Sequence, residues 1–436
     1  MSGRRLGSLL TVVGLTLGMI TTGVAFAGGN PDTDFSKLKP IKEPASCKDG
    51  DGVTADTIKV GVISPTSGTQ AQSYAPSTEQ GIEARIEHAN SSGELGDRTI
   101  ELVKKDDQGS QANNLTAAQQ LVEEEGVFGI IELSPAADGS AEYLYDEKIP
   151  VGGWHNGLKE WGIYPNMFSW RNTVPPEPEN TFTSRAGDVM KQLGAKKIAV
   201  VGTNLAASAV FVDQTTQAIE KTKGLEVVYD TTDITPEQQD FTGIADQIKS
   251  SGADGVYTGL AGLQANGLSQ AIKQAGVELK AIVFPGGYDD RVVSLPGYEG
   301  AYLGTEFKPL EVGSPGLTEY EDVMTAAGFE PQRFFALQGY FGADSFINGI
   351  KAAGVDCPTR KAFINNLRLE AGYDAGGAFV PVDYADIFGR PFYCVYYVQI
   401  QNQQFVPVND GEPICATKLF EDGKTKKLSK ADQAKG

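Results

Sequence analysis

Polar and aromatic side chains gather in short loops of this sequence, each directly after a run of β-branched or apolar residues. Open α/β sheets bind small molecules at the carboxyl ends of their strands, so these loops are the natural place for a ligand. The candidate contacts are Thr66, Ser67, Gly68, Ser134, Ala136, Trp154, His155, Asn156, Asn204, Ser208, Gln264, Tyr288 and, within an apolar helix, Gln338. Hydroxyls, amides and rings of this kind predict noncovalent binding.

The first loop and the aromatic residues each have a structural alternative. Thr66 and Ser67 can donate hydroxyl hydrogens and the amide of Gly68 can hold an oxyanion, or the loop is only a turn into the next helix. Trp154 and Tyr288 can stack on a ring or an acyl body, or they pack at the rim of the site.

Signatures of enzymes are few. The chain has two histidines, too few for a histidine-rich metal site, and we interpret His155 as a neutral hydrogen-bonding residue. The sequence contains no Gly-x-Ser-x-Gly motif, no Walker loop and no Gly-x-Gly-x-x-Gly after the first strand. Asp106 and Asp107 are paired carboxylates that we assign to surface or hinge hydrogen bonds, and core packing is the alternative for Gln338. We therefore expect no cofactor and no catalysis.

Alternating strands and helices position these loops. Strands are expected at 57–63, 100–104, 127–133, 150–153, 197–202, 226–229, 255–259 and 280–284, with helices at 79–90, 113–125, 182–193, 210–221, 241–250 and 264–274. The rhythm breaks at the proline-rich segment 173–180, which divides it into two halves. Such alternation predicts two parallel sheets covered by helices on both sides. Helices at 315–327, 332–353 and 359–369 and a strand-like tail from 389 are expected to return to these halves through a hinge.

The N-terminus is typical of an export signal. Residues 1–27 contain two early arginines, an uncharged apolar stretch and the sequence Ala25-Phe26-Ala27, which signal peptidase can cleave. A retained transmembrane helix is the weaker alternative, and the arginine pair leaves twin-arginine and general export both open. Cys47 lies too far from the apolar stretch to be a lipid-bearing first residue, so we expect a periplasmic or secreted protein that is not a lipoprotein.

Composition limits the partners. The chain of 436 residues is long enough for two domains, and residues 28–55 are expected to be a flexible leader. A formal net charge of −19 argues against nucleic acid and anionic membrane surfaces, and favours a monomer.

Four cysteines in an exported chain suggest two disulfides, for which three connectivities are possible. Cys394 and Cys415 flank two apparent strands, 392–401 and 404–408, so a bridge within this hairpin region is plausible and would leave Cys47 with Cys357. The alternative is that one or more of them are free buried thiols.

Several short motifs, taken in order, carry a resemblance to a known family. They are Ile58-Lys59-Val60-Gly61-Val62-Ile63-Ser64-Pro65-Thr66-Ser67-Gly68, Gln80-Gly81-Ile82-Glu83-Ala84, Asp106-Asp107, Phe168-Ser169-Trp170-Arg171-Asn172-Thr173 and Asp240-Phe241. Together they resemble the leucine/isoleucine/valine-type periplasmic binding proteins over about residues 56–430. No single motif is specific, but their succession along the chain is.

The resemblance implies a type I periplasmic binding protein: two doubly wound parallel-sheet α/β domains joined by a three-strand hinge, with a ligand cleft between them. It implies a soluble receptor of an ABC importer, whose partners are the membrane permease and the ATPase subunits. One domain would contain 56–172 plus 309–378, and the other 173–308 plus 379–436. This division places Cys47 and Cys357 in or beside the first domain and Cys394 and Cys415 in the second, which is the pairing suggested above.

The sequence departs from the amino-acid binders of that family where they hold their ligand. An acidic residue usually faces the ligand's ammonium from a loop of the second domain, after a proline, and here that place is Gly286. A buried ammonium without a carboxylate costs on the order of several kcal/mol. We therefore expect a neutral or acidic ligand with an apolar or aromatic body, unless Asp289 or Asp290 substitutes. A sensory receptor without transport and, third, a hydrolase on a related scaffold are the alternative functions.

Overall fold

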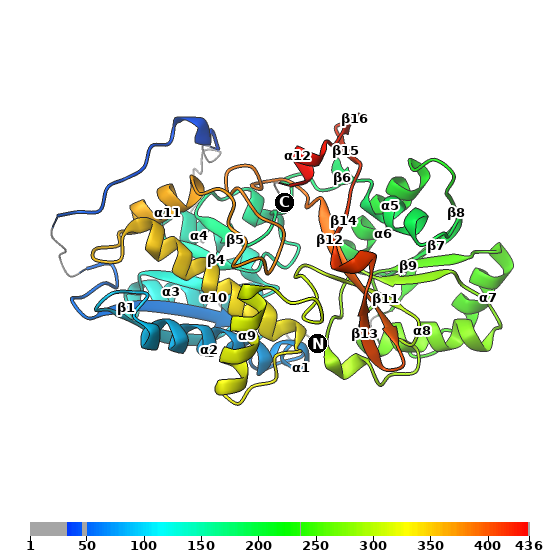
Figure 1. The fold of residues 1–436 in the computed structure, drawn as a ribbon, viewed down its shortest axis with the longest axis horizontal. Helices are drawn as coiled ribbons and strands as arrows, with labels where there is room; N and C mark the ends of the chain where they lie inside the picture. The colour runs from blue at the N-terminus through cyan, green and yellow to red at the C-terminus, as the bar shows by residue number, and fades with distance from the viewer. Residues whose placement is uncertain (1–32, 46–49, 236, 435–436) are drawn as a thin grey trace, which may run out of the picture. The chain divides into compact units, whose positions relative to one another are not determined.

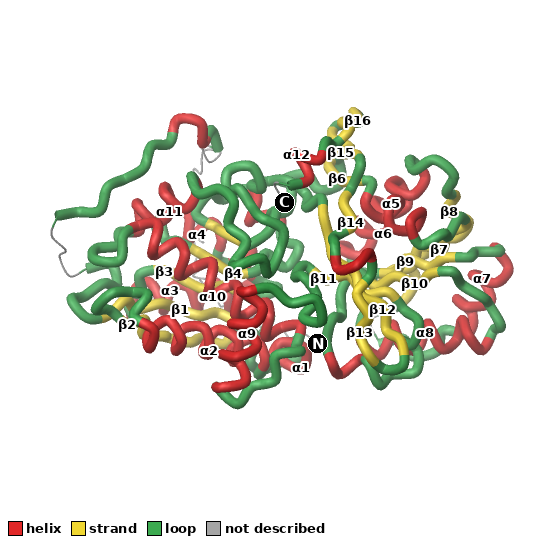
Figure 2. Tube along the Cα trace, in the orientation of Figure 1, coloured by secondary structure: helices red, strands yellow, loops and turns green. Residues whose placement is uncertain are grey.

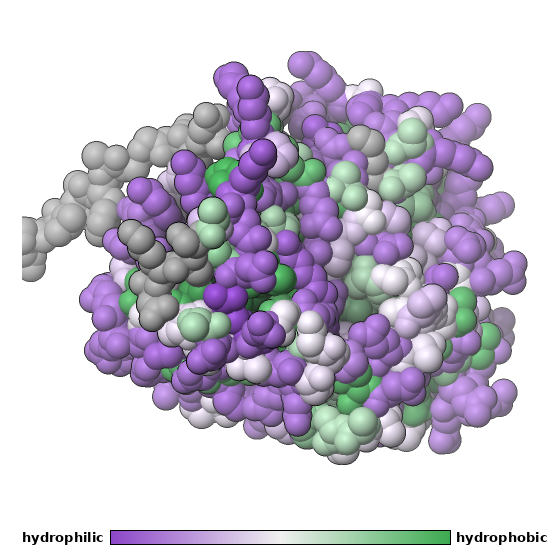
Figure 3. Space-filling view, turned by 60° about the vertical axis from the view of Figure 1, so that its left-hand side comes forward, coloured by the Kyte–Doolittle hydropathy of each residue, from purple (hydrophilic) through white to green (hydrophobic). Residues whose placement is uncertain are grey.

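The computed structural model of the protein describes residues 33–45, 50–235 and 237–434, which form an α/β structure (Figure 1). The predicted export signal, residues 1–27, lies outside these ranges. In the described part of the chain, no helix is long and apolar enough to cross a membrane. Helices flank the strands (Figure 2), and on the face seen in Figure 3 hydrophilic side chains predominate, in keeping with the high charge.

The first sheet has five parallel strands in the order β2-β1-β3-β4-β5. These are β1 (Thr57–Ser64), β2 (Thr99–Asp106), β3 (Gly129–Glu132), β4 (Val151–Gly153) and β5 (Met167–Ser169). The helices of this part are α1 (Ala71–Tyr74), α2 (Ser77–Ser92), α3 (Gln111–Gln119, continued by a π-helical turn Gln120–Glu124), α4 (Ala141–Asp146), α9 (Pro315–Ala326), α10 (Phe334–Ala353) and α11 (Arg360–Arg368). The β-branched residues of β1 are buried because the strand is inside the sheet and covered on both faces.

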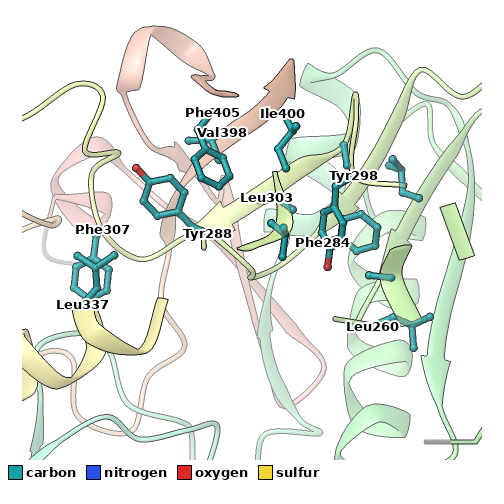
Figure 4. Close-up of a cluster of buried hydrophobic side chains, with 14 of the residues drawn as sticks. Leu260, Phe284, Tyr288, Tyr298, Leu303, Phe307, Leu337, Val398, Ile400 and Phe405 are labelled. Atoms are coloured by element: carbon teal, nitrogen blue, oxygen red, sulfur yellow. The ribbon is translucent and has the colours of Figure 1, made fainter. Parts of the chain in front are cut away.

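The second sheet has the order β13-β12-β11-β10-β9-β7-β8. Its parallel strands are β7 (Lys197–Thr203), β8 (Glu226–Ile234), β9 (Gly255–Thr258), β10 (Ala281–Phe284) and β11 (Tyr302–Thr305), and its antiparallel strands are β12 (Cys394–Gln401) and β13 (Gln404–Pro407). The helices that accompany it are α5 (Arg185–Gln192), α6 (Ala206–Glu220), α7 (Thr242–Ser251) and α8 (Gly262–Gln274). A buried apolar cluster on its strands and on the turn before β11 includes Phe284, Tyr298 and Leu303 (Figure 4).

The chain passes three times between the elements of the first sheet and those of the other sheets. We call residues 170–180, 306–314 and 369–393 the first, second and third connections. The predicted domain boundaries at 172/173, 308/309 and 378/379 each fall within one of them. The connections contain mostly turns and extended loops rather than strands.

A small third sheet was not predicted. It has the order β16-β15-β6 and consists of β6 (Thr181–Thr183), β15 (Lys418–Glu421) and β16 (Lys424–Lys427), followed by α12 (Lys430–Gln433). The helix expected at 182–193 begins only at Arg185, because Phe182 pairs with Phe420 across β6 and β15, with ring centroids 5.1 Å apart.

Helix α10 packs directly on α2 through glycines. A Cβ at Gly81 would collide with the carbonyl of Ala336, and a Cβ at Gly339 would collide with the carbonyl of Thr78. The two helix backbones therefore touch, and each glycine is required by the approach of the other helix. This contact joins residues that are more than 250 positions apart in the sequence.

The predicted bridge between Cys394 and Cys415 is confirmed. The two residues lie opposite each other where β12 pairs with β14 (Ile414–Cys415), and their sulfurs are bonded. Cys357 is also disulfide-bonded, so the alternative of a free thiol is wrong for these three residues. The predicted partner of Cys357 is Cys47, which lies outside the described residues.

The segment expected to be a flexible leader, 28–55, is held against α11 within residues 33–45. The amide of Asn366 accepts a hydrogen bond from the backbone N–H of Ile41 at 2.8 Å and donates one to the carbonyl of Ile41 at 2.9 Å. The ring of Phe35 lies 4.9 Å from the guanidinium carbon of Arg368. The composition of the segment predicts disorder, and it cannot reveal hydrogen bonds to residues that are distant in the sequence.

We predict that Gly339→Ala destabilises the protein by about 2 kcal/mol. Overpacking a tight contact costs roughly 1–3 kcal/mol, which outweighs the helix propensity of up to about 1 kcal/mol that alanine gains over glycine. Denaturant unfolding of the variant and the parent measures the difference. Gly243→Ala in α7 is the matched control, because a Cβ at that position has no atom within 4 Å. The control should be neutral or slightly stabilised, and equal behaviour of the two variants would contradict the role of the helix contact.

Candidate ligand-binding site

The loops after β1, β3 and β4 lie at one edge of the first sheet, since these strands are parallel neighbours. They contain the predicted contacts 66–68, 134–136 and 154–156. The structure thus brings together eight of the predicted residues.

The loop after β1 is organised by the carboxylate of Asp106, at the end of β2. It accepts hydrogen bonds from the backbone N–H of Thr66 at 2.9 Å and of Ser67 at 3.2 Å, and from the hydroxyl of Ser67. Burial opposes these bonds, but together they lower the pKa of Asp106 below its ordinary value. Gly68 has φ +80°, a left-handed conformation that favours glycine. The hydroxyl of Ser67 is left as an acceptor rather than a donor.

The loop after β3 rests on buried carboxylates. Ser134 donates its N–H to Glu132 at 2.9 Å, and its hydroxyl accepts the N–H of Ala136 at 3.0 Å. The amide of Asn114 lies between Glu132 and Asp107, donating to Asp107 at 3.0 Å. Burial, and secondly the charge of Asp107, raise the pKa of Glu132 well above its ordinary value. Glu132 therefore keeps its proton to a higher pH than an exposed glutamate does.

The loop after β4 carries two buried N–H donors. Nδ1 of His155 accepts the N–H of Gly157 at 2.9 Å, so the ring proton of the neutral imidazole is on Nε2. Burial, and then the charge of Arg171, lower the pKa of His155 well below its ordinary value. Within the described residues neither Nε2 of His155 nor Nε1 of Trp154 has a hydrogen-bond partner, although both atoms are buried. Such atoms are satisfied by a water molecule or by an acceptor atom of a ligand.

An aromatic wall surrounds this loop. The ring of Trp154 lies edge-on to those of Phe334 and Phe335, with centroids 5.8 and 5.9 Å apart, and Tyr74 packs on Phe335 at 4.2 Å. The hydroxyl of Tyr74 donates to the side chain of Asn156 at 2.9 Å. We define Tyr74, Trp154, Phe334 and Phe335 as the aromatic wall. The sequence analysis missed three of these four, although the doubled phenylalanine at the start of α10 was a visible signal.

Helix α10 also contributes Gln338, which is fully buried. Its Nε2 donates to Glu306 at 3.4 Å, and its Oε1 has no partner among the described residues. Glu306 forms an ion pair with Arg171. Gln338 thus connects the ligand side of α10 to the second connection.

In the second sheet the predicted polar residues hold their own loops. The hydroxyl of Ser208 accepts the N–H of Thr203 at 2.8 Å, and the amide of Gln264 donates to the carbonyl of Thr235 at 2.9 Å. Asn204 is exposed. Two leucines that the sequence analysis missed stand at these loops: Leu205 is 54% exposed and Leu263 is 77% exposed. Since β7 and β9 are neighbours, both belong to one edge of the sheet.

Tyr288 lies in the core. It is fully buried, its ring packs on Phe405 at 4.8 Å (Figure 4), and its hydroxyl donates to Glu311 at 2.6 Å while accepting the N–H of Leu310 at 2.8 Å. The ring therefore belongs to the core of the second sheet, and neither stacks on an exposed ligand position nor lies at the rim of a site.

The acidic residues after β10 already have cationic partners. Asp289 pairs with Arg291 at 2.7 Å and accepts the N–H of Phe334 at 3.1 Å, and Asp290 pairs with Arg333. Burial opposes these bonds, but those from Arg291 lower the pKa of Asp289 below its ordinary value. Gly286 faces open space, because a Cβ there would have no atom within 4 Å.

A cavity of about 280 Å³ lies away from these loops, beside the third connection and α12. It is lined by acidic and basic side chains, among them Asp386, Arg390 and Asp432. It contains none of the predicted contacts.

Comparison with known families decides the class of the protein. A family model described as periplasmic binding protein matches residues 57–404, most of the chain. The chain belongs to that family. Its members are extracytoplasmic solute-binding proteins, and this periplasmic binding protein is of the leucine/isoleucine/valine type, as the sequence predicted.

Relatives and solved structures agree with this assignment. A Leu/Ile/Val-binding protein homolog of Brucella abortus is 24% identical over 327 residues, which cover 71% of this chain and 82% of the relative. The solute-binding protein of an ABC transporter from R. palustris, in complex with 4-hydroxybenzoate, is 24% identical with a TM-score of 0.64, covering 85% of this chain and 98% of its own.

A branched-chain amino acid ABC transporter protein from Thermus thermophilus with bound valine is 15% identical with a TM-score of 0.68, covering 84% and 98%. These likenesses confirm the predicted type I α/β fold.

We predict that Glu132→Gln stabilises this periplasmic binding protein as the pH rises. The folded state keeps a proton on Glu132 that the unfolded chain releases above about pH 4.3, so the free energy of unfolding falls from that pH towards the raised pKa. Glutamine mimics the protonated acid and removes this loss. Urea unfolding at pH 4 and pH 8 should show a gain for the variant of at least about 1 kcal/mol at pH 8 relative to pH 4.

Glu87→Gln, at an exposed carboxylate of α2, is the control and should show no such gain. An equal pH dependence of the parent and the Glu132→Gln variant would contradict the assignment of a buried protonated acid.

Proposed function

We propose that this protein captures a small organic molecule that bears a hydrogen-bond acceptor, such as a carboxylate or carbonyl, on an apolar or aromatic body, and delivers it to an ABC importer. The observation that carries the proposal is the pair of buried, unpartnered N–H donors at Trp154 and His155. Donors of this kind are satisfied by an acceptor oxygen, and leaving them unpaired costs about 1–3 kcal/mol each.

The surroundings of the donors support an apolar or aromatic ligand body. The aromatic wall offers ring edges and faces, and Leu205 and Leu263 are large apolar side chains exposed at the strand ends of the second sheet. Burying such groups against a ligand is worth roughly 25 cal/mol per Å². A relative that was solved with 4-hydroxybenzoate fits this description, and the one with valine fits it less well.

The acidic loop after β10 argues against an α-amino acid. An ammonium group needs a carboxylate, but Asp289 and Asp290 are paired with Arg291 and Arg333, and Gly286 supplies none. Freeing Asp289 for a ligand would break its ion pair with Arg291 and leave its carboxylate, which is only 6% exposed, without a cationic partner.

We propose capture by closure of two lobes, 56–172 plus 309–378 and 173–308 plus 379–436. The ligand binds the strand-end loops of one lobe, and the second lobe closes over it, so the differential affinity for the closed form shifts the population. The permease and ATPase subunits would recognise that form. Residues 1–27 act in this proposal as a cleaved export signal of a monomeric protein without a lipid anchor.

A thermal-shift screen of the purified protein tests the proposal. The panel contains aromatic and aliphatic carboxylates, amides, polyols and branched-chain amino acids. A ligand at 100 times its dissociation constant stabilises by about 2.7 kcal/mol, which is a shift of several degrees. We expect the shift with carboxylates or amides and its loss in Trp154→Ala. Leucine or valine giving the largest shift would contradict the proposed ligand class.

We predict that Gly286→Asp gives the protein affinity for α-amino acids. The position has room for a side chain, and a carboxylate there would face the ammonium group. Calorimetric titration with leucine and valine should change from no detectable heat to measurable binding. Gly243→Asp, which adds the same charge on α7, is the matched control. Amino-acid binding that is absent in both variants, or gained equally by both, would argue against this reading of the loop.

A further inference from the structure

The three connections meet at one charged side chain. Arg171 follows β5 at the start of the first connection, and its side chain is 13% exposed. It forms an ion pair with Glu306, at the start of the second connection, whose side chain is 17% exposed. Its guanidinium carbon lies 4.0 Å from the ring centroid of Phe392, in the third connection. Arg171 therefore contacts both of the other connections.

The ring of Phe392 is shared by a second cation. The guanidinium carbon of Arg185, the first residue of α5, lies 4.2 Å from the same ring centroid. Arg171 follows the last strand of the first sheet, whereas Arg185 belongs to a helix that accompanies the second sheet. Phe392 thus contacts one cation from each of these two parts of the chain, and its ring attracts both of them although their charges repel each other.

Backbone contacts around Arg171 depend on the same arrangement. Thr173 donates its N–H to the carbonyl of Ile387 at 3.1 Å, and its hydroxyl accepts the N–H of Gly389 at 2.6 Å, which joins the first and third connections. Trp170 stacks on Phe307, with ring centroids 5.9 Å apart, which joins the first and second. The free space beside this group is about 20 Å³, room for roughly one water molecule.

The same side chain reaches towards the candidate ligand site. Glu306, its ion-pair partner, accepts the hydrogen bond from Gln338, whose Oε1 is buried without a partner in the described part of the chain. The charge of Arg171 also acts on His155, one of the two donors assigned to the ligand. A ligand at these groups and the three connections therefore share one network of contacts.

We propose that Arg171 is the positioning residue of the hinge: by pairing with Glu306 and stacking on Phe392, it fixes the three connections relative to one another and transmits ligand contact at Gln338 to them. The role of Arg171 in transmitting ligand contact rests on the proposed function, whereas its role in fixing the three connections does not. A guanidinium suits the role because its edge pairs with a carboxylate while its face stacks on a ring, and an ammonium cannot do both.

Hydrogen exchange of the ligand-free protein tests the proposal. Arg171→Lys keeps the charge and loses the fork and the flat face, and Glu306→Gln keeps the shape and loses the charge. In both variants the amides of Thr173 and Gly389 should exchange at least about tenfold faster than in the parent. Arg360→Lys is the matched control: the side chain of Arg360 is 18% exposed, donates to the carbonyls of Val127 and Phe128 and pairs with Asp51, and none of these partners belongs to a connection.

The control should leave the Thr173 and Gly389 amides unchanged, even if it lowers the melting temperature. Unchanged exchange in both hinge variants, or equal acceleration in the control, would overturn the proposal. If Arg171→Lys does not fold, the exchange rates of the Thr173 and Gly389 amides in Glu306→Gln alone test the proposal. Hydrogen exchange is measured without ligand, so its result remains valid even if the thermal-shift screen finds no ligand. For a ligand that does bind, both hinge variants should change its dissociation rate by about tenfold, with no change in which panel members bind.

Discussion

The contact between α2 and α10 is the constraint on which the rest of the structure depends. At Gly81 and Gly339 the two backbones touch, which no other residue type would permit. Helix α10 comes after the parallel strands of the second sheet, so the chain has to return to the first sheet to make this contact. Having returned, it must leave again to complete β12. The three connections follow from one helix pair.

The same return builds the candidate site. The first turns of α10 bring Phe334, Phe335 and Gln338 to the strand ends of the first sheet, beside Trp154. A site assembled from loops of one sheet and a helix from a later part of the chain is sensitive to the path of the connections between them. This is why a buried ion pair at the connections and the ligand groups share contacts, and why polar groups there are retained despite the cost of desolvation.

Much of the fold and part of the site could be predicted from the sequence. The run 57–63 is rich in β-branched residues, which is typical of a buried parallel strand, and its neighbours follow at helix-length intervals. The bridge between Cys394 and Cys415 was predictable because the two residues flank adjacent strands. Strand β5, with three residues, is too short for any periodicity to appear.

What the sequence could not show depends on contacts between distant residues. Periodicity revealed a helix over 332–353 but not which of its turns meets Trp154, so the aromatic wall was missed. Likewise, composition marked the leader as disordered because the hydrogen bonds of Ile41 are made to Asn366, more than 300 positions away. The exposed leucines could not be predicted for a different reason: Leu205 and Leu263 carry no polar group, and hydrogen-bonding side chains are the more visible signal of a ligand site in a sequence.

The buried neutral imidazole of His155 has a consequence for the environment in which the protein can work. As the medium becomes moderately acidic, Nδ1 stays an acceptor for the N–H of Gly157, because burial holds the pKa of the ring well below its ordinary value, and the loop keeps the Nε2–H in place. The receptor's donor is thus constant over this range, whereas a carboxylate ligand becomes neutral near pH 4. The acid limit of binding would then be set by the pKa of the ligand rather than by that of His155.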